Sequence, residues 1–150
     1  MDLFKLFAIS SAGMSAQRSR MSVITGNLAN AETTRTPEGG PYRRRDVVFK
    51  AVPLAGRFSD LLAENLDETD QSPLGVEVTD IKPSTRPPRK NFDPNHPDAD
   101  AQGYVLLPDI NAMEEMVDLL SAVRSYEANL TVYTTTKNLV RRLLEVGRAG

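Results

Sequence analysis

The single histidine of the chain, His96, lies in the acidic segment Asp93-Pro-Asn-His-Pro-Asp-Ala-Asp100. An imidazole and three carboxylates within eight residues could in principle ligate a divalent cation. However, the two prolines stiffen the segment, no glycine lies where a calcium loop needs one, and its Asp-Pro and Asn residues are typical of turns. We therefore interpret it as a turn, with a metal-dependent hydrolase that uses His96, Asp98 and Asp100 as one alternative.

Other residues that carry catalysis are scarce. The chain has no cysteine and no Gly-x-Ser-x-Gly elbow, so it offers no activated nucleophile. Arg43, Arg44 and Arg45 could bind phosphate, but alternation along a strand would divide them between two faces, which favours a solvated or interface-pairing edge. Lys and Arg total 18 against 20 Asp and Glu, so the net charge of −2 gives no attraction to nucleic acid. We predict a protein that is not an enzyme, with no catalytic residue, cofactor or metal.

The distribution of proline predicts the elements that hold these residues. All ten prolines lie between Pro37 and Pro108, and proline breaks a helix interior, so only the two ends can form long helices. We predict a mainly α fold with a small β-rich middle. An N-terminal amphipathic helix spans residues 1–31, the middle spans 32–110, and a C-terminal helix at 111–147 packs against the first as a coiled-coil-like hairpin within one domain.

Each end of the chain carries an apolar stripe at heptad spacing. Glycines in the first helix cost about 1 kcal/mol each relative to alanine, so that helix should be weak by itself. The last helix begins at the N-cap Asn111, with Glu114 placed to reach back to the Asn111 amide. The predicted assembly interface consists of Phe7, Met14, Met21, Leu28, Met116, Leu119, Val123, Tyr126, Leu130, Tyr133, Val140 and Leu144.

Two roles for these stripes remain open from the residues alone. They could be the core faces of a helical hairpin inside a monomer. A C-terminal helix of about 36 residues would be about 54 Å long, whereas the radius of gyration of a compact chain of this size is about 15 Å. Two such helices around a small β module cannot bury both stripes against each other, so contacts with other chains are the natural completion.

The middle of the chain has short β-rich segments separated by turns. Asp46 to Val52, Leu74 to Ile81 and Tyr104 to Leu107 have the composition or alternation of strands. Between the first two, we expect a loop or insertion near residues 53–73, with at most one or two helical turns. No stretch of the sequence approaches the roughly 20 apolar residues of a membrane-spanning helix.

Several motifs follow one another in the order found in the flagellar rod and hook proteins. Ala12-Gly-Met-Ser-Ala-Gln-Arg18, Asn27-Leu-Ala-Asn30 and Gly39-Gly-Pro-Tyr-Arg-Arg-Arg-Asp-Val-Val-Phe49 resemble that axial family. Asn95 to Val105 and Glu114 to Leu119 resemble its proximal rod members. The motif residues are Asn27, Asn30, Gly39, Gly40, Pro41, Tyr42, His96, Pro97, Asp98, Asp100, Gly103 and Tyr104.

This resemblance implies a structural subunit of the proximal rod in the flagellar basal body. Its terminal helices would pair and assemble with neighbours, so that the rod transmits torque in motility. The implied location is the periplasm, reached through the flagellar export apparatus without a cleaved signal peptide. The implied partners are that apparatus, other rod proteins and the membrane-embedded base (the MS-ring and export-gate side). The alternative is a cytosolic helical adapter that forms a small closed oligomer.

Overall fold

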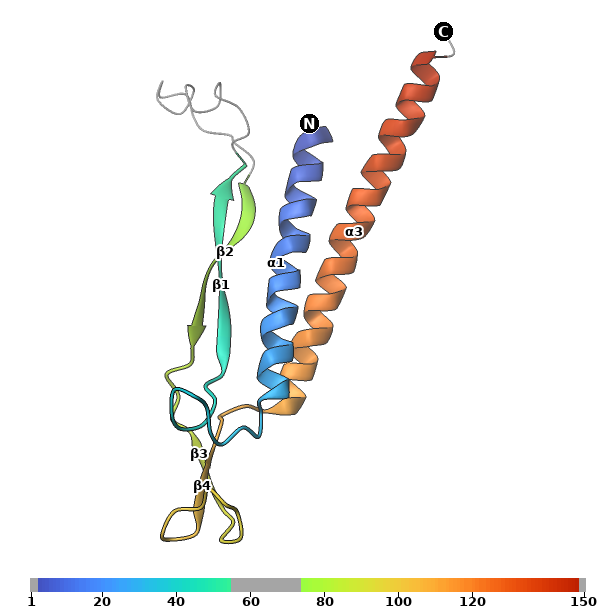
Figure 1. The fold of residues 1–150 in the computed structure, drawn as a ribbon. Helices are drawn as coiled ribbons and strands as arrows, with labels where there is room; N and C mark the ends of the chain where they lie inside the picture. The colour runs from blue at the N-terminus through green and yellow to red at the C-terminus, as the bar shows by residue number, and fades with distance from the viewer. Residues whose placement is uncertain (1–2, 55–73, 149–150) are drawn as a thin grey trace, which may run out of the picture. The chain divides into compact units, whose positions relative to one another are not determined.

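The computed structural model describes residues 3–54 and 74–148 of the chain. Two long helices enclose a small β region in the sequence, so the expected fold class is confirmed (Figure 1). In chain order the elements are α1 (Leu3–Ala29), β1 (Arg45–Pro53), β2 (Leu74–Pro83), β3 (Arg89–Phe92), β4 (Tyr104–Leu107) and α3 (Ala112–Arg148).

The long helix α3 begins at the cap that the sequence predicts. The Asn111 Oδ1 atom accepts the Met113 amide at 3.1 Å, which satisfies one of the unpaired donors of the first turn. Glu114 was expected to accept the Asn111 backbone amide, and this expectation is wrong. Its carboxylate instead accepts the Asn111 side-chain amide at 3.2 Å. The 37 residues of α3 correspond to a length of about 55 Å at 1.5 Å per residue.

The strands form two separate two-stranded sheets, β1 with β2 and β3 with β4. In the second sheet the strands are antiparallel, with Arg89 opposite Leu107 and Phe92 opposite Tyr104. The three strand segments expected from the sequence fall within or overlap β1, β2 and β4. The prediction missed β3, because its four residues, Arg-Lys-Asn-Phe, are mostly polar and show no alternation. Of the expected loop at 53–73, residues 55–73 lie outside the described part.

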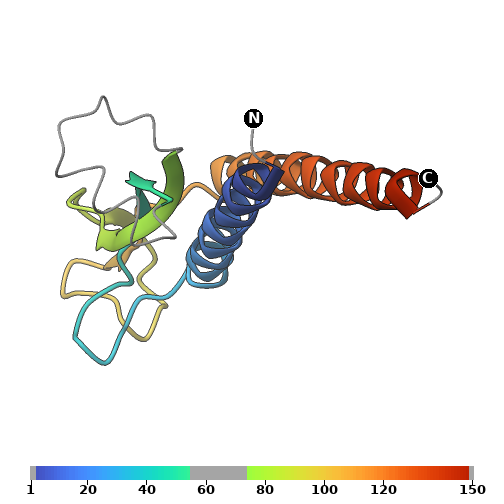
Figure 2. The ribbon, with the colours of Figure 1, turned by 90° about the horizontal axis from the view of Figure 1, so that it is seen from above.

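The chain divides into two compact units, and both helices contribute to each unit. Among the described residues, the first unit comprises 3–18, 49–54, 74–79 and 124–148, and the second comprises 19–48 and 80–123. Figure 2 shows α1 beside α3. In both units, residues with higher numbers on α1 contact residues with lower numbers on α3. The two helices are therefore antiparallel.

In the first unit, the helices meet through small side chains and one aromatic pair. Phe7 and Tyr133 contact each other edge to face, with ring centroids 5.0 Å apart. A Cβ atom added to Gly13 would lie 2.8 Å from the Asn129 Oδ1 atom, so glycine allows α3 to approach closely here. Ser10, Ala16 and Thr136 are buried.

In the second unit, the buried apolar residues come from both helices, from β4 and from the segment between β4 and α3. Ile24 on α1 and Ala122 on α3 are buried, as are Val105 and Ile110. Alongside them lie two buried polar side chains, Asn27 and Glu115, whose partners define the site described next.

Candidate functional site

A buried carboxylate lies in the first turn of α3. Glu115 is 1% exposed, and a buried charge is costly unless it is paired and hydrogen-bonded. Its Oε1 atom accepts the Arg44 Nε–H group at 2.5 Å, and its Oε2 atom accepts the Asn27 side-chain amide at 3.2 Å. One carboxylate therefore joins the start of α3 to the last turns of α1 and to the residue preceding β1.

Asn27 acts as a backbone mimic at this junction. Its side-chain amide donates to the Arg45 carbonyl oxygen, and its Oδ1 atom accepts the Arg45 amide, both at 2.9 Å. The Tyr42 hydroxyl donates to the same Oδ1 atom at 3.3 Å. Asn27 is 1% exposed, so its amide needs this complete set of partners. The two bonds to Arg45 fix the start of β1 against α1.

The second asparagine of the motif has a more local role. The Asn30 side-chain amide donates to the Gly26 carbonyl oxygen at 2.8 Å, and its Oδ1 atom accepts the Thr33 hydroxyl. From the sequence we expect both asparagines to bond nearby backbone at the exit from the first helix. That expectation is confirmed for Asn30. It is wrong for Asn27, which binds backbone 18 residues further along the chain.

Arg44 is the cation of the junction. Besides Glu115 it contacts Asp46, and its Nη2 atom lies 3.8 Å from Asp118, which also pairs with Arg20 at 3.3 Å. Burial acts to lower the pKa of Arg44, but its hydrogen bond and attraction to Glu115, together with the charge of Asp46, raise that pKa above its ordinary value. The guanidinium therefore stays protonated.

The sequence-based interpretation of Arg43, Arg44 and Arg45 as a solvated or interface-pairing edge needs one correction. Arg43 and Arg45 are exposed, and the Arg45 guanidinium lies over the Tyr42 ring at 5.7 Å. Arg44, in contrast, is partly buried and makes an internal ion pair. Because side chains alternate along an extended segment, Arg44 points to the face opposite that of Arg43 and Arg45, and Glu115 lies on that face.

The residues of the predicted assembly interface are distributed over partly covered and exposed positions, and none is fully buried. Phe7 and Tyr133 are the pair with a direct ring contact. Met116, Leu130 and Leu144 are exposed by 46%, 41% and 64%. The other partly covered members are Met14, Met21, Leu28, Leu119, Val123, Tyr126 and Val140.

The seam of the helix pair consists mainly of residues outside that set. Its buried positions on α1 are occupied by Ser10, Ala16, Ile24 and Asn27. On α3 they recur at intervals of seven as Glu115, Ala122, Asn129 and Thr136, of which Asn129 is partly covered and the others are buried. Apolar periodicity overlooks such positions because they are small or polar. Their heptad spacing, together with Gly13, is the signal that could have revealed them.

Large apolar side chains on α3 face away from this seam. In the second unit, Met113, Met116, Val117 and Leu120 follow the i, i+3, i+4, i+7 spacing of one helix face and are 46–70% exposed. We call these four residues the outer patch. Exposed apolar residues are common singly, but a contiguous group of them marks an interaction surface.

The glycine-containing motif before β1 forms a tight turn. Gly39 and Gly40 have φ values of 91° and 76°, in the left-handed region that favours glycine. The Thr36 amide donates to the Gly40 carbonyl oxygen at 2.9 Å, which closes the turn before Pro41 and Tyr42. This turn brings Tyr42 to Asn27.

The histidine-containing segment forms the connection between β3 and β4. His96 Nδ1 accepts the Asp98 amide, and the Asp98 carboxylate accepts the Thr34 hydroxyl at 2.7 Å. Asp100 Oδ1 accepts the amides of Gln102 and Tyr104, both at 2.9 Å. Apart from the bond between Thr34 and Asp98, these bonds are local and typical of turns. Within residues 3–54 and 74–148, no cluster of three or more His, Cys, Asp or Glu side chains is placed to hold a metal ion.

The remaining motif residues complete this connection. Gly103 adopts a φ of 82°, and Phe92 packs edge to face on Tyr104 with ring centroids 5.3 Å apart. Pro97 is exposed. Among the helices that the structure describes, none is both long and apolar enough to cross a membrane.

Two family models match the chain, one at each end. The flagella basal body rod protein model matches residues 7–35, and the flagellar basal body rod FlgEFG protein C-terminal model matches residues 101–146. The first match contains Asn27 and the second contains Glu115, which are bonded to each other in the junction. Paired terminal helices with these two matches define the class of protein, a structural subunit of the flagellar basal-body rod.

Relatives of full length narrow this assignment. The chain is 40% identical to the flagellar basal-body rod protein FlgC of Borreliella burgdorferi, over 97% of this chain and 98% of the relative. It is 38% identical to FlgC of Bacillus subtilis over 99% and 100%, and 41% identical to FlgC of Aquifex aeolicus over 97% of each chain. The chain belongs to the FlgC family of flagellar basal-body rod proteins, which confirms the resemblance found in the sequence.

Proposed function

We propose that this rod subunit stands in the proximal rod and transmits torque by packing α3 against helices of neighbouring rod subunits. The observation that carries this proposal is the outer patch of Met113, Met116, Val117 and Leu120. Full burial of such a side chain is worth about 1.5–3 kcal/mol. Many contacts of this size spread shear over several neighbours, which a rotating shaft requires.

The end of α3 supports the same proposal in the first unit. Phe7 of α1 contacts Tyr133, and only four residues of α1 precede Phe7, whereas α3 continues for fifteen residues beyond Tyr133. The last turns of α3 therefore extend past the start of α1. Leu143, Leu144 and Val146 are 62–74% exposed there. We assign this overhang, with the twelve residues of the predicted assembly interface, to contacts that other subunits complete.

The cellular setting of the proposal follows from family membership. We infer a periplasmic location, export through the flagellar apparatus with an uncleaved N-terminus, and contacts with the membrane-embedded base as well as with rod proteins. The role is structural rather than enzymatic. A cytosolic adapter forming a closed oligomer would share the apolar surfaces, but membership of the FlgC family favours the rod.

The test places an aspartate in the outer patch. Val117→Asp, expressed in a strain lacking its own copy, should abolish swimming and assembled basal bodies while the exported amount stays at the wild-type level. Thr135→Asp is the matched control, because Thr135 is also exposed on α3. Thr135 follows Val117 by 18 residues, which correspond to five helical turns, so the two side chains leave the helix in the same direction. Normal swimming of the Val117→Asp strain would refute the proposed role of the outer patch.

A further inference from the structure

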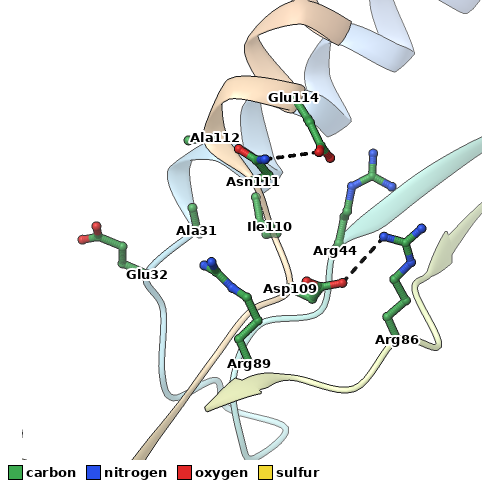
Figure 3. A pocket seen from close by; sticks show the side chains of 10 residues that line it. All are labelled: Ala31, Glu32, Arg44, Arg86, Arg89, Asp109, Ile110, Asn111, Ala112 and Glu114. Atoms are coloured by element: carbon green, nitrogen blue, oxygen red, sulfur yellow. Dashed lines mark hydrogen bonds and ion pairs between the residues drawn. The ribbon is translucent and has the colours of Figure 1, made fainter. Parts of the chain in front are cut away.

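An open cavity of about 640 Å³ lies in the second unit, at the start of α3 (Figure 3). Its charged lining comprises Arg44, Arg86, Arg89, Glu32, Asp109 and Glu114. The function described above assigns no role to this cavity. The backbone amides at the start of α3 do not by themselves make this cavity a binding site, because the Asn111 side chain already caps that helix.

Three of these six charges, Arg44, Arg86 and Asp109, form ion pairs within the chain. Arg44 is paired with the buried Glu115, and the Arg86 Nη1 atom lies 3.7 Å from the Asp109 carboxylate. Glu114 accepts a hydrogen bond from the Asn111 side-chain amide, which is neutral and leaves the charge of Glu114 in place. Of the lining charges, these interactions leave Arg89 as the cation without a counter-charge, and Glu32 and Glu114 as the carboxylates.

Arg89 is oriented but not neutralised. Its Nε–H group donates to the Pro108 carbonyl oxygen at 3.1 Å, which fixes the plane of the guanidinium. Within the described part of the chain, its two Nη atoms have no hydrogen-bond or ion-pair partner. Figure 3 shows the guanidinium directed toward Ala31 and the start of α3, while the Glu32 carboxylate points away from it. The cavity thus presents a fixed fork of unpaired N–H donors.

A planar fork of this kind matches a carboxylate, which can accept two parallel hydrogen bonds. We propose that this cavity is a docking site for an aspartate or glutamate side chain of a neighbouring rod subunit, which Arg89 binds. The inference rests on the proposed assembly role. Met113 of the outer patch lies between Ala112 and Glu114, which line the cavity, so the patch and the cavity both lie at the start of α3.

The test removes the fork while leaving the fold intact. Arg89→Gln should unfold at a temperature within about 2 °C of the wild type, because it is an exposed substitution, and should be exported normally. The yield of intact basal bodies should fall by about ten- to one-hundredfold, the effect of losing a charge-assisted contact. Lys90→Gln is the control, since it removes the same charge from the next residue of β3, on the opposite face.

A chemical experiment identifies the carboxylate directly. Isolated basal bodies containing Arg89→Lys are treated with a carbodiimide, which joins an amine to an adjacent carboxylate. A cross-linked peptide between position 89 and an Asp or Glu of another subunit supports the proposal. Cross-links from Lys90 alone would overturn it. So would Arg89-dependent binding of succinate to the purified protein at micromolar concentration, because the site would then belong to a small dicarboxylate.

The outcomes separate this inference from the proposed function. If the wild-type gene fails to restore rods in the deletion strain, membership in the rod assembly is refuted. If the wild-type gene and Arg89→Gln restore rods equally, only the docking site is refuted. If Arg89→Gln lowers the unfolding temperature in step with rod yield, Arg89 acts through folding and the docking site is likewise refuted.

Discussion

Arg44 and Glu115 are 71 residues apart in sequence, yet the Arg44 Nε atom lies 2.5 Å from the Glu115 Oε1 atom. Glu115 is 1% exposed, whereas the side chain of Arg44 is 28% exposed. The pair therefore connects the buried surface of α3 with the partly exposed residue that precedes β1. Because Asn27 also donates to Glu115, a single carboxylate couples the pairing of α1 with α3 to the placement of β1.

The first prediction concerns that carboxylate. Glu115→Gln keeps the size of the side chain but leaves Arg44 without its main counter-charge, so the free energy of unfolding should fall by about 1–3 kcal/mol. Urea unfolding of the purified protein measures this change. The control is Glu127→Gln on the exposed surface of α3, expected to change stability by less than about 0.5 kcal/mol. Equal stability of the two variants would show that the buried pair contributes nothing.

The second prediction concerns Asn27. Asn27→Asp retains an acceptor for the Arg45 amide but loses the donor to the Arg45 carbonyl oxygen, and it adds a negative charge beside Glu115. We expect it to destabilise the protein by more than Asn27→Ala, which itself costs about 1–3 kcal/mol. Thermal unfolding followed by circular dichroism gives the order of the two variants. Amide hydrogen exchange at Arg45 should accelerate in Asn27→Ala, which removes the acceptor of that amide, and unchanged protection there would contradict the assigned bond.

The third prediction compares two glycines of α1. At Gly26 an added Cβ has ordinary space, its nearest neighbour being the Tyr42 hydroxyl at 4.0 Å, so Gly26→Ala should stabilise the protein by about 0.5–1 kcal/mol. At Gly13 the added Cβ meets Asn129 at 2.8 Å, and Asn129 is anchored by donating to the Ser125 carbonyl oxygen. Gly13→Ala should therefore be destabilising. Adding Asn129→Ala to Gly13→Ala should recover the stabilisation that alanine gives over glycine in a helix. Chemical unfolding of Gly26→Ala, of Gly13→Ala and of the double variant measures the three changes in stability.

The fourth prediction concerns the overhang of α3. In the purified monomer, residues 138–148 lack an adjacent α1 and pack few side chains, so their amides should exchange faster than those of residues 115–130. Hydrogen exchange measured by mass spectrometry compares the two segments. In isolated basal bodies the difference should disappear, because neighbouring subunits cover the overhang. Slow exchange of both segments in the monomer would show that the overhang is stable without neighbours.

The positions of the two helices follow from local features of the sequence. Confinement of proline to residues 37–108 and the cap at Asn111 required long helices at both ends, because these effects act within a few residues. The turn bonds of Asp98 and Asp100 could be anticipated for the same reason. The order of motifs was sufficient to indicate the family.

Which faces of the two helices meet depends on tertiary packing. Heptad periodicity marked the large apolar residues, but the helices pair closely through Gly13, Ala16 and Ala122, since small side chains permit close approach and long-range fit has no local signal. The same holds for Glu115. In the sequence it is one of two acids in the first turn of α3, and only the fold brings Arg44 and Asn27 into contact with it. Much of the apolar stripe on α3 is exposed because one chain offers too little surface to cover it, which is the physical basis for the proposal that neighbouring rod subunits cover that surface.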